Sequence, residues 1–121
     1  MATTLYEALE SRILLLDGGM GTMIQQYGFA EEDYRGGRFR DHEQRLRGCN
    51  DLLVLTQPDA VRAIHEKYLA AGADIVATDS FNANAVSLRD YGLEGHAYEI
   101  SQAAAALARS AADRFTARNP Q

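Results

Sequence analysis

Two short apolar runs stand out along the chain, at residues 13–16 and 75–77, and each is followed at once by small or charged residues. The first run leads into Asp-Gly-Gly and the second into Thr-Asp-Ser. Runs that are apolar on both faces are typical of buried parallel strands, because helices cover both sides of such a sheet. The pattern therefore predicts two strands. For the first run, the end of a helix that begins near Thr4 is the alternative, which the abrupt glycine pair disfavours.

Two amphipathic segments predict helices that follow these runs in the fold. The earlier helix has Thr56 as its candidate N-cap and Pro58 in its first turn, and it ends at Gly72, which accepts a left-handed conformation. The later helix covers residues 95–118, where apolar side chains recur every three or four positions. The order of strand, helix, strand and helix predicts two βα units.

A complete α/β domain needs more chain than these two units provide. Two parallel strands would leave both outer edges unpaired, and a (β/α)8 barrel takes about 250 residues, whereas this chain has 121. We therefore expect residues 1–121 to form a single partial domain, the N-terminal fragment of a larger α/β domain. The alternative is a small chain that pairs its strand edges with another molecule.

The charge and the single cysteine exclude several classes of protein. The chain has 12 basic and 17 acidic side chains, a net charge of −5 at pH 7, which excludes nucleic acid as an expected partner because phosphate binding needs a basic face. No run approaches the length of about 18 apolar residues that a membrane span needs, and residues 1–11 lack the basic start of a signal peptide. The single Cys49 points to a reducing compartment, so the expected location is cytoplasmic. Residues 25–50 balance arginines against acids and are interpreted as a solvated surface.

The sharpest candidate for chemistry is the stretch Asp17-Gly18-Gly19-Met20-Gly21-Thr22, directly after the first apolar run. Glycines at this place let the backbone approach a ligand and leave amides free to bind an anion. A dinucleotide fingerprint would need glycine where Ile24 stands, and a P-loop would need a lysine, so phosphate recognition is disfavoured. A small zwitterion fits better, since amides take its carboxylate while an aspartate or a strand-end carbonyl takes its ammonium group. A purely structural turn is the alternative.

Thr78 and Asp79 follow the second run and are the other candidates. The ends of neighbouring parallel strands lie roughly 5 Å apart, and α/β proteins place their sites at the carboxyl ends of strands. One ligand could therefore touch both Asp17 and Asp79, unless Asp79 only caps the following turn. No two histidines have metal-ligand spacing, and His65 is interpreted as a packed or surface residue. Cys49 lacks a neighbouring base, so no catalytic nucleophile is assigned.

Several dispersed segments carry a resemblance when they are taken in order: Ile13–Thr22 (ILLLDGGMGT), Phe29–Phe39 (FAEEDYRGGRF), Gly48–Asp59 (GCNDLLVLTQPD), Ile64–Glu66 (IHE), Ala71–Ile75 (AGADI) and Thr78–Phe81 (TDSF). The chain resembles the opening of the cobalamin-dependent methionine synthase family, from about Leu9 to Ala117. The long excursion after the glycine turn and its NDLL sequel favour this family. The related betaine and S-methylmethionine homocysteine methyltransferases share the glycine turn.

The resemblance implies a (β/α)8 (TIM) barrel, of which this incomplete chain would hold the first two βα units. It implies a methyltransferase that passes a methyl group from methylcobalamin, ultimately from 5-methyltetrahydrofolate, to homocysteine and so forms methionine. The implied cofactors of the full-length protein are cobalamin and zinc, which keeps the homocysteine sulfur deprotonated. In that family the glycine turn and the second strand end border the amino-acid end of homocysteine. The implied substrate-binding residues are Asp17, Gly18, Gly19, Thr22, Thr78 and Asp79.

Two departures limit what the resemblance implies. The zinc-binding cysteines of the family lie beyond the part that this chain matches, and Cys49 is not one of them, so no metal or catalytic residue is assigned. The family usually has asparagine where Asp79 stands. We expect a fragment that is inactive alone and binds no zinc or cobalamin, with homocysteine, the remainder of the barrel, and the folate and cobalamin modules as partners. A stand-alone small-ligand binding or assembly module without methyl transfer is the alternative.

Overall fold

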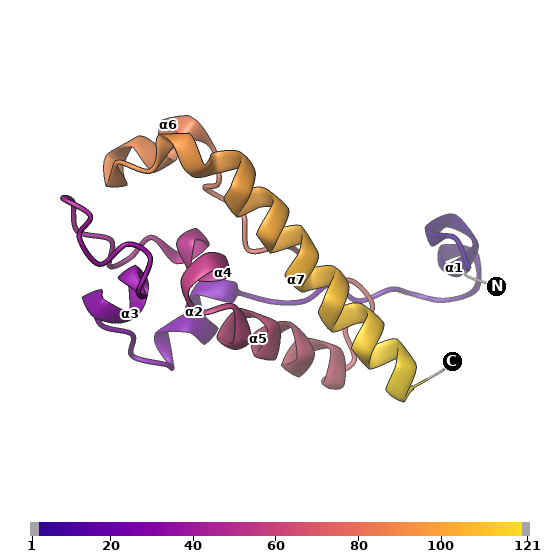
Figure 1. Ribbon diagram of the computed structural model, residues 1–121. Coiled ribbons are helices and arrows are strands. Elements are labelled where there is room, and N and C mark those ends of the chain that lie inside the picture. Colours follow the sequence, from indigo (N-terminus) through magenta and orange to yellow (C-terminus); the bar gives the residue numbers. More distant parts are fainter. Residues whose placement is uncertain (1–2, 120–121) are drawn as a thin grey trace.

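The computed structural model describes residues 3–119 as a series of helices joined by turns and extended stretches (Figure 1). In chain order these are α1 (Leu5–Ser11), α2 (Met20–Gln25), α3 (Glu31–Arg35), η1 (Asn50–Leu52), α4 (Leu53–Thr56), α5 (Pro58–Ala70), α6 (Ala85–Leu88), η2 (Arg89–Tyr91), η3 (Glu94–His96) and α7 (Ala97–Arg118), where η marks a 3-10 helix. Within residues 3–119, no helix is both long and apolar enough to cross a membrane.

The two apolar runs predicted as strands lie side by side, but they pair at one point. Leu16 and Ile75 form an isolated parallel bridge. There the Ile75 N–H donates to the Leu15 carbonyl at 3.2 Å, and the Asp17 N–H donates to the Ile75 carbonyl at 3.0 Å. The part of the chain that the structure describes contains no strand. The predicted α/β class, with the first two βα units of a (β/α)8 (TIM) barrel, is therefore wrong, and residues 3–119 are mostly helical.

Two aspartate side chains explain why the pairing stops on either side of this bridge. The next ladder bond in one direction would join the Ala77 N–H to the Asp17 carbonyl, but that N–H donates to the Asp17 carboxylate at 3.0 Å. In the other direction, the Leu15 N–H donates to the Asp74 carboxylate at 3.0 Å. A parallel pair with no neighbour on its outer edges gains too little from further pairing to overcome this competition.

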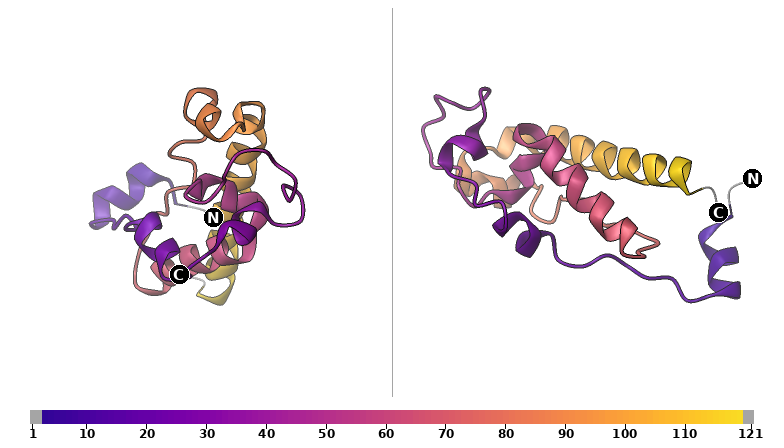
Figure 2. Two further views of the ribbon diagram at one scale, coloured as in Figure 1. Left: turned by 90° about the vertical axis from the view of Figure 1, so that its left-hand side faces the viewer. Right: turned by 90° about the horizontal axis from the view of Figure 1, so that it is seen from below.

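Helix α7 packs along α5, and this pair forms the centre of the molecule (Figures 1 and 2). Helix α5 buries Val61, Ile64 and Leu69, as its apolar pattern predicts. Helix α7 buries Ile100 together with alanines, whose small side chains let two helices approach closely. Both predicted helices are thus confirmed.

The two ends of α5 compare differently with the prediction. Gly72 has a φ of +115°, which confirms it as the left-handed residue after the helix. The predicted N-cap at Thr56 is wrong, because Thr56 ends α4 and Gln57 stands between it and Pro58. The Thr56 hydroxyl donates to the Leu52 carbonyl one turn earlier, so its hydrogen bond belongs to α4 and not to the start of α5.

The segment at residues 25–50 contributes to the core. Tyr34, Phe39 and Leu46 are buried, and they belong to the same apolar cluster as the buried residues of α4, α5 and α7. The interpretation of this segment as a solvated surface is therefore wrong for these positions. The balance of charges concerns only the polar residues of a segment. It does not predict whether the apolar residues between them are buried.

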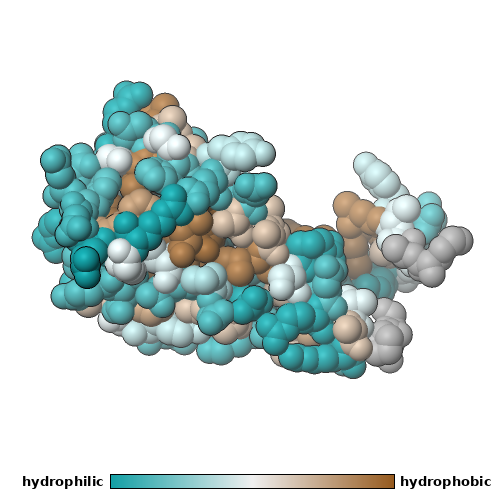
Figure 3. All heavy atoms as spheres, viewed as in Figure 1, coloured by the Kyte–Doolittle hydropathy of each residue, from teal (hydrophilic) through white to brown (hydrophobic). Residues whose placement is uncertain are grey.

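Helix α1 stands apart from the rest of the molecule, at the end of an extended stretch (Figures 1 and 2). It buries none of its residues, and its apolar Leu5 and Leu9 are about half exposed, at 52% and 53%. An ion pair of 2.9 Å between Arg12 and Asp74 ties the base of this arm to the body. The space-filling view shows apolar side chains on the arm and over the middle of the body (Figure 3).

Candidate functional site

The glycine turn after the first apolar run lies against the segment after the second. One carboxylate oxygen of Asp17 accepts a hydrogen bond from the Ala77 N–H at 3.0 Å. From another direction, the Tyr68 hydroxyl on α5 donates to the Gly19 carbonyl at 2.7 Å. The turn is thus held at both of its ends, and Asp17 lies next to the segment that carries Thr78.

The two glycines of the turn differ in their surroundings. Gly18 packs against Tyr68 so closely that a Cβ at this position would lie 3.0 Å from the hydroxyl oxygen. Gly19 precedes α2 and has an ordinary φ of −67°. A Cβ at Gly19 would lie 3.5 Å from Oγ1 of Thr22, so the exposed Thr22 side chain lies close to the turn.

Thr78 and Asp79 border different spaces. The Thr78 hydroxyl oxygen lies 2.6 Å from that of Ser80, and Thr78 borders a groove against α7 with a volume of about 540 Å³. Asp79 is only 5% exposed and borders a separate pocket. Of the predicted substrate-binding residues, only Asp79 lines that pocket. The structure therefore brings the glycine turn to the Thr78 segment but does not gather all of these residues around one cavity.

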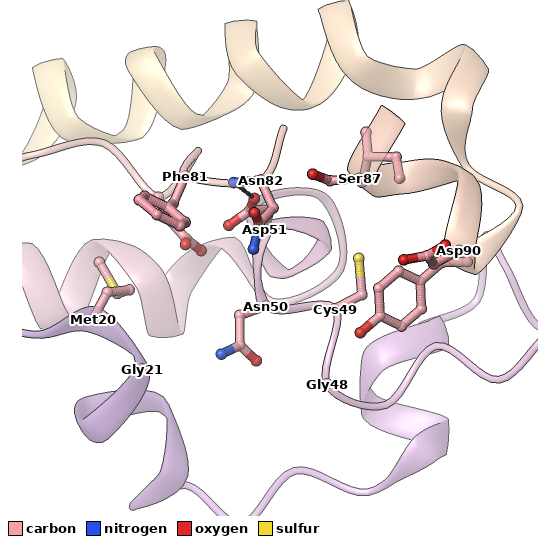
Figure 4. A pocket seen from close by; sticks show the side chains of 13 residues that line it. Met20, Gly21, Gly48, Cys49, Asn50, Asp51, Phe81, Asn82, Ser87 and Asp90 are labelled. Carbon is pink, nitrogen blue, oxygen red and sulfur yellow. Dashed lines mark hydrogen bonds between the residues drawn. The ribbon is translucent and has the colours of Figure 1, made fainter. Parts of the chain in front are cut away.

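The pocket that Asp79 borders has a volume of about 510 Å³ and is built from four parts of the chain (Figure 4). Its walls come from the start of α2 and from residues 48–51, 79–82 and 87–91. The charged side chains among its lining residues are all acidic, namely Asp51, Asp79 and Asp90. The pocket is therefore electrically negative.

Asp51 and Asp79 are the buried members of this acidic set, with exposed fractions of 6% and 5%. Burial, together with the adjacent charge of Asp51, raises the pKa of Asp79 to about 8, and burial also raises the pKa of Asp51. Two adjacent carboxyl groups without a counter-charge titrate as a pair. Sequence reasoning missed Asp51. The only local signal is an acid at the start of an apolar run, at residues 52–55.

His65 is fully buried on α5, and within the described residues neither of its ring nitrogens has a hydrogen-bond partner. Burial lowers the pKa of His65, although the nearby charge of Asp17 acts in the opposite direction. Of the two interpretations, a packed or a surface residue, the packed one is confirmed. His65 stands four positions after Val61 and four before Leu69, and this spacing on one helix face is a signal of burial.

Comparison with known proteins adds to this geometry. The family model described as homocysteine S-methyltransferase matches residues 14–120. The chain belongs to this family. Among solved structures, the homocysteine methyltransferase MmuM from Escherichia coli, in its oxidized form, is similar to the chain with a TM-score of 0.75 and 27% sequence identity. The match covers 97% of this chain and 36% of MmuM, so the chain spans about a third of that enzyme's length.

The zinc that the family resemblance implies does not fit the residues of this chain. Within residues 3–119, no three His, Cys, Asp or Glu side chains gather closely enough to hold a metal ion. Cys49 is buried, and burial raises the pKa of its thiol to about 11. A thiol that stays protonated at neutral pH is a poor metal ligand and a poor nucleophile.

Proposed function

We propose that the chain supplies part of the homocysteine site of a cobalamin-dependent methionine synthase. The full-length protein would transfer a methyl group from methylcobalamin, ultimately from 5-methyltetrahydrofolate, to the sulfur of homocysteine and so form methionine. Family membership supports homocysteine as the substrate. The GCNDLLVLTQPD segment at residues 48–59 supports the cobalamin-dependent type.

The observation that carries the proposal is the contact between the glycine turn and the second candidate segment. Asp17 uses one carboxylate oxygen for the 3.0 Å bond to the Ala77 N–H, which leaves the other oxygen for an ammonium group. Gly19 is the N-cap of α2 and has no side chain that could bond to the first amides of this helix, so these amides can face a carboxylate. A carboxylate beside free amides complements the two charges of an amino acid.

In this proposal, this chain and the rest of a family-length protein bind different molecules or different parts of one molecule. Here Asp17, Gly18, Gly19 and Thr22 bind the amino-acid end of homocysteine, and Thr78 lies on the segment beside them, whereas Asp79 borders a separate pocket. The sulfur must lose its proton before it accepts a methyl group, because the thiolate is the nucleophile, and the residues of this chain do not fit zinc. We therefore assign zinc, folate and cobalamin binding to the rest of the family-length protein.

The test is homocysteine binding by a protein in which this chain is joined to the rest of a family-length sequence. Asp17→Asn keeps an acceptor for the Ala77 N–H but removes the charge that faces the ammonium group. A hydrogen bond to a charged group contributes about 1.5–3 kcal/mol. Calorimetry should therefore show homocysteine binding weakened about 10- to 100-fold.

Asp59→Asn is the matched control, because Asp59 is an exposed acid in the first turn of α5. This variant should bind homocysteine as the parent does, and zinc content should be equal in all three proteins. Unchanged affinity in Asp17→Asn would exclude the assignment. A parallel loss of zinc would indicate misfolding, and homocysteine binding without any methyl transfer would favour the stand-alone binding module.

A further inference from the structure

Asp51 and Asp79 lie where η1 meets the turn at residues 79–82. One carboxylate oxygen of Asp51 accepts the N–H of Asn82 at 2.6 Å. Figure 4 shows Asp51 and Asn82 side by side, next to Phe81. Asp79 is 5% exposed, and its Oδ2 is buried without a hydrogen-bond partner among the described residues. A buried carboxylate oxygen without a hydrogen-bond partner raises the free energy of the folded state unless it binds a proton.

None of the described residues that line the pocket carries a positive charge that could balance two carboxylates. The pocket lining adds the exposed carboxylate of Asp90, the thiol of Cys49 and the phenol of Tyr91, while α2 contributes only the uncharged Met20 and Gly21. Burial and the neighbouring acids raise the pKa of Cys49 to about 11, and they also raise the pKa of Tyr91. Neither group therefore titrates together with the pair near neutral pH. Two adjacent buried carboxylates in this setting cannot both be ionised at low cost.

We propose that Asp51 and Asp79 share a single proton, and that Asp51 is thereby a positioning residue for the candidate site. Asp51 holds Asn82 through one oxygen and Asp79 through the shared proton, so the turn that follows Thr78 is fastened to η1. The inference rests on the proposed function in one respect, which is that the fastened turn borders homocysteine. The proton sharing itself depends only on the buried pair.

The shared proton makes this attachment depend on pH. The pKa of Asp79 is raised to about 8 in the folded chain, against an ordinary value of about 4 for an aspartate. The stability that the bound proton contributes is therefore complete below about pH 4 and is lost as the pH rises through about 8. Above that pH both carboxylates are ionised, and their repulsion loosens the 79–82 turn.

Infrared titration of the whole chain, with isotope-labelled aspartate, tests the shared proton directly and does not depend on the association state of the chain. One carboxylic acid C=O band should persist at pH 7 and disappear with a midpoint near pH 8. In Asp79→Asn, whose amide still donates to Asp51, the band should be absent at pH 7. Asp90→Asn removes the exposed acid of the same pocket, and this matched control should leave the band unchanged.

Hydrogen exchange of the peptide that covers residues 79–88 tests the positioning role. After correction for the intrinsic effect of pH on exchange, the wild type should exchange several-fold faster at pH 9 than at pH 6. Asp79→Asn should show no such change, because an amide does not ionise in this range. Asp51→Ala should exchange fast at both pH values, whereas a role of Asp51 without the shared proton would leave the wild type insensitive to pH.

The proposal is overturned if the wild type shows no carboxylic acid band at pH 7, or if that band remains in Asp79→Asn. It is also overturned if added magnesium ions abolish the band at pH 7, because the pair would then be a cation site. An exchange rate in the wild type that does not change with pH overturns the positioning role. None of these measurements uses homocysteine, so a failure of the proposed function leaves them unaffected.

Discussion

Gly18 and Gly19 are neighbours in the sequence, but only Gly18 is tightly packed against another side chain. A Cβ at Gly18 would lie 3.0 Å from the hydroxyl oxygen and 3.1 Å from Cε1 of Tyr68, whereas a Cβ at Gly19 would lie 3.5 Å from the nearest Thr22 atom. Neither glycine has a positive φ. Tyr68 is not free to move aside, because its hydroxyl donates to the Gly19 carbonyl at 2.7 Å.

We expect Gly18→Ala to lower the free energy of unfolding by about 1–2 kcal/mol, since the added methyl group displaces Tyr68 and weakens its hydrogen bond. Gly19→Ala should lower it by less than about 1 kcal/mol. In a Tyr68→Leu background, Gly18→Ala should lose most of its effect because the two positions are coupled. Chemical denaturation measures all of these variants. An equal decrease in the free energy of unfolding for Gly18→Ala and Gly19→Ala would contradict the tight packing of Gly18 against Tyr68.

At the scale of elements, residues 36–47 have no helix or strand of their own, and side chains organise them instead. Arg35 ends α3 and pairs with Glu31 at 2.8 Å. The Glu31 carboxylate also accepts the N–H groups of Leu46 and Arg47. Arg35 donates in addition to the backbone carbonyls of Phe39, Arg40, His42 and Gln44. One guanidinium group therefore shapes the whole connection between α3 and η1.

Arg35→Lys should lower the free energy of unfolding by about 2 kcal/mol, because an ammonium group cannot reproduce the planar fork of donors and several carbonyls lose their partner. Arg38→Lys is the matched control. Arg38 pairs with Glu99 at a contact where both side chains are about half exposed, so its loss should be below about 1 kcal/mol. Hydrogen exchange at residues 36–47 should quicken in Arg35→Lys alone. Similar exchange in both variants would mean that the segment is held by its apolar residues.

At the scale of the whole molecule, large apolar side chains remain exposed. Ile13 is 83% and Leu16 is 71% exposed on the arm that leads from α1, and Phe81 is 91% exposed after the second candidate segment. The groove of about 540 Å³ against α7 adds further apolar surface. The match to MmuM covers 36% of that enzyme. We infer that in a family-length protein the rest of the chain covers these surfaces, since large exposed apolar patches mark interaction sites.

We therefore expect the isolated chain to self-associate, with an average mass in sedimentation that rises with concentration. Adding the rest of a family-length protein as a separate chain should convert the oligomers into a defined complex. Ile13→Gln removes one exposed apolar side chain and should reduce self-association without changing helix content. A compact monomer at all concentrations, with strongly protected amides at residues 13–16 and 75–77, would show that the chain is a self-sufficient fold.

The sequence by itself determined the two long helices, the glycine turn and the family. Helices α5 and α7 are visible because their apolar spacing and their end signals, such as Gly72, are local. The glycine turn at Asp17 was also predicted from a local pattern. The homocysteine S-methyltransferase family, although not the cobalamin-dependent type, is confirmed by the match over residues 14–120.

Only the tertiary structure decided whether the apolar runs form strands and which acids are buried. A strand exists only through its partners, and here the side chains of Asp17 and Asp74 take the amides that a longer ladder needs. The attachment of Asp51 to Asn82 spans 31 positions, and the loss of solvent that raises the pKa of Asp79 comes from segments far apart in the chain. The pKa of a buried acid depends on every group around it in space, including groups far away in the sequence. No pattern of adjacent residues could therefore reveal the buried pair of Asp51 and Asp79.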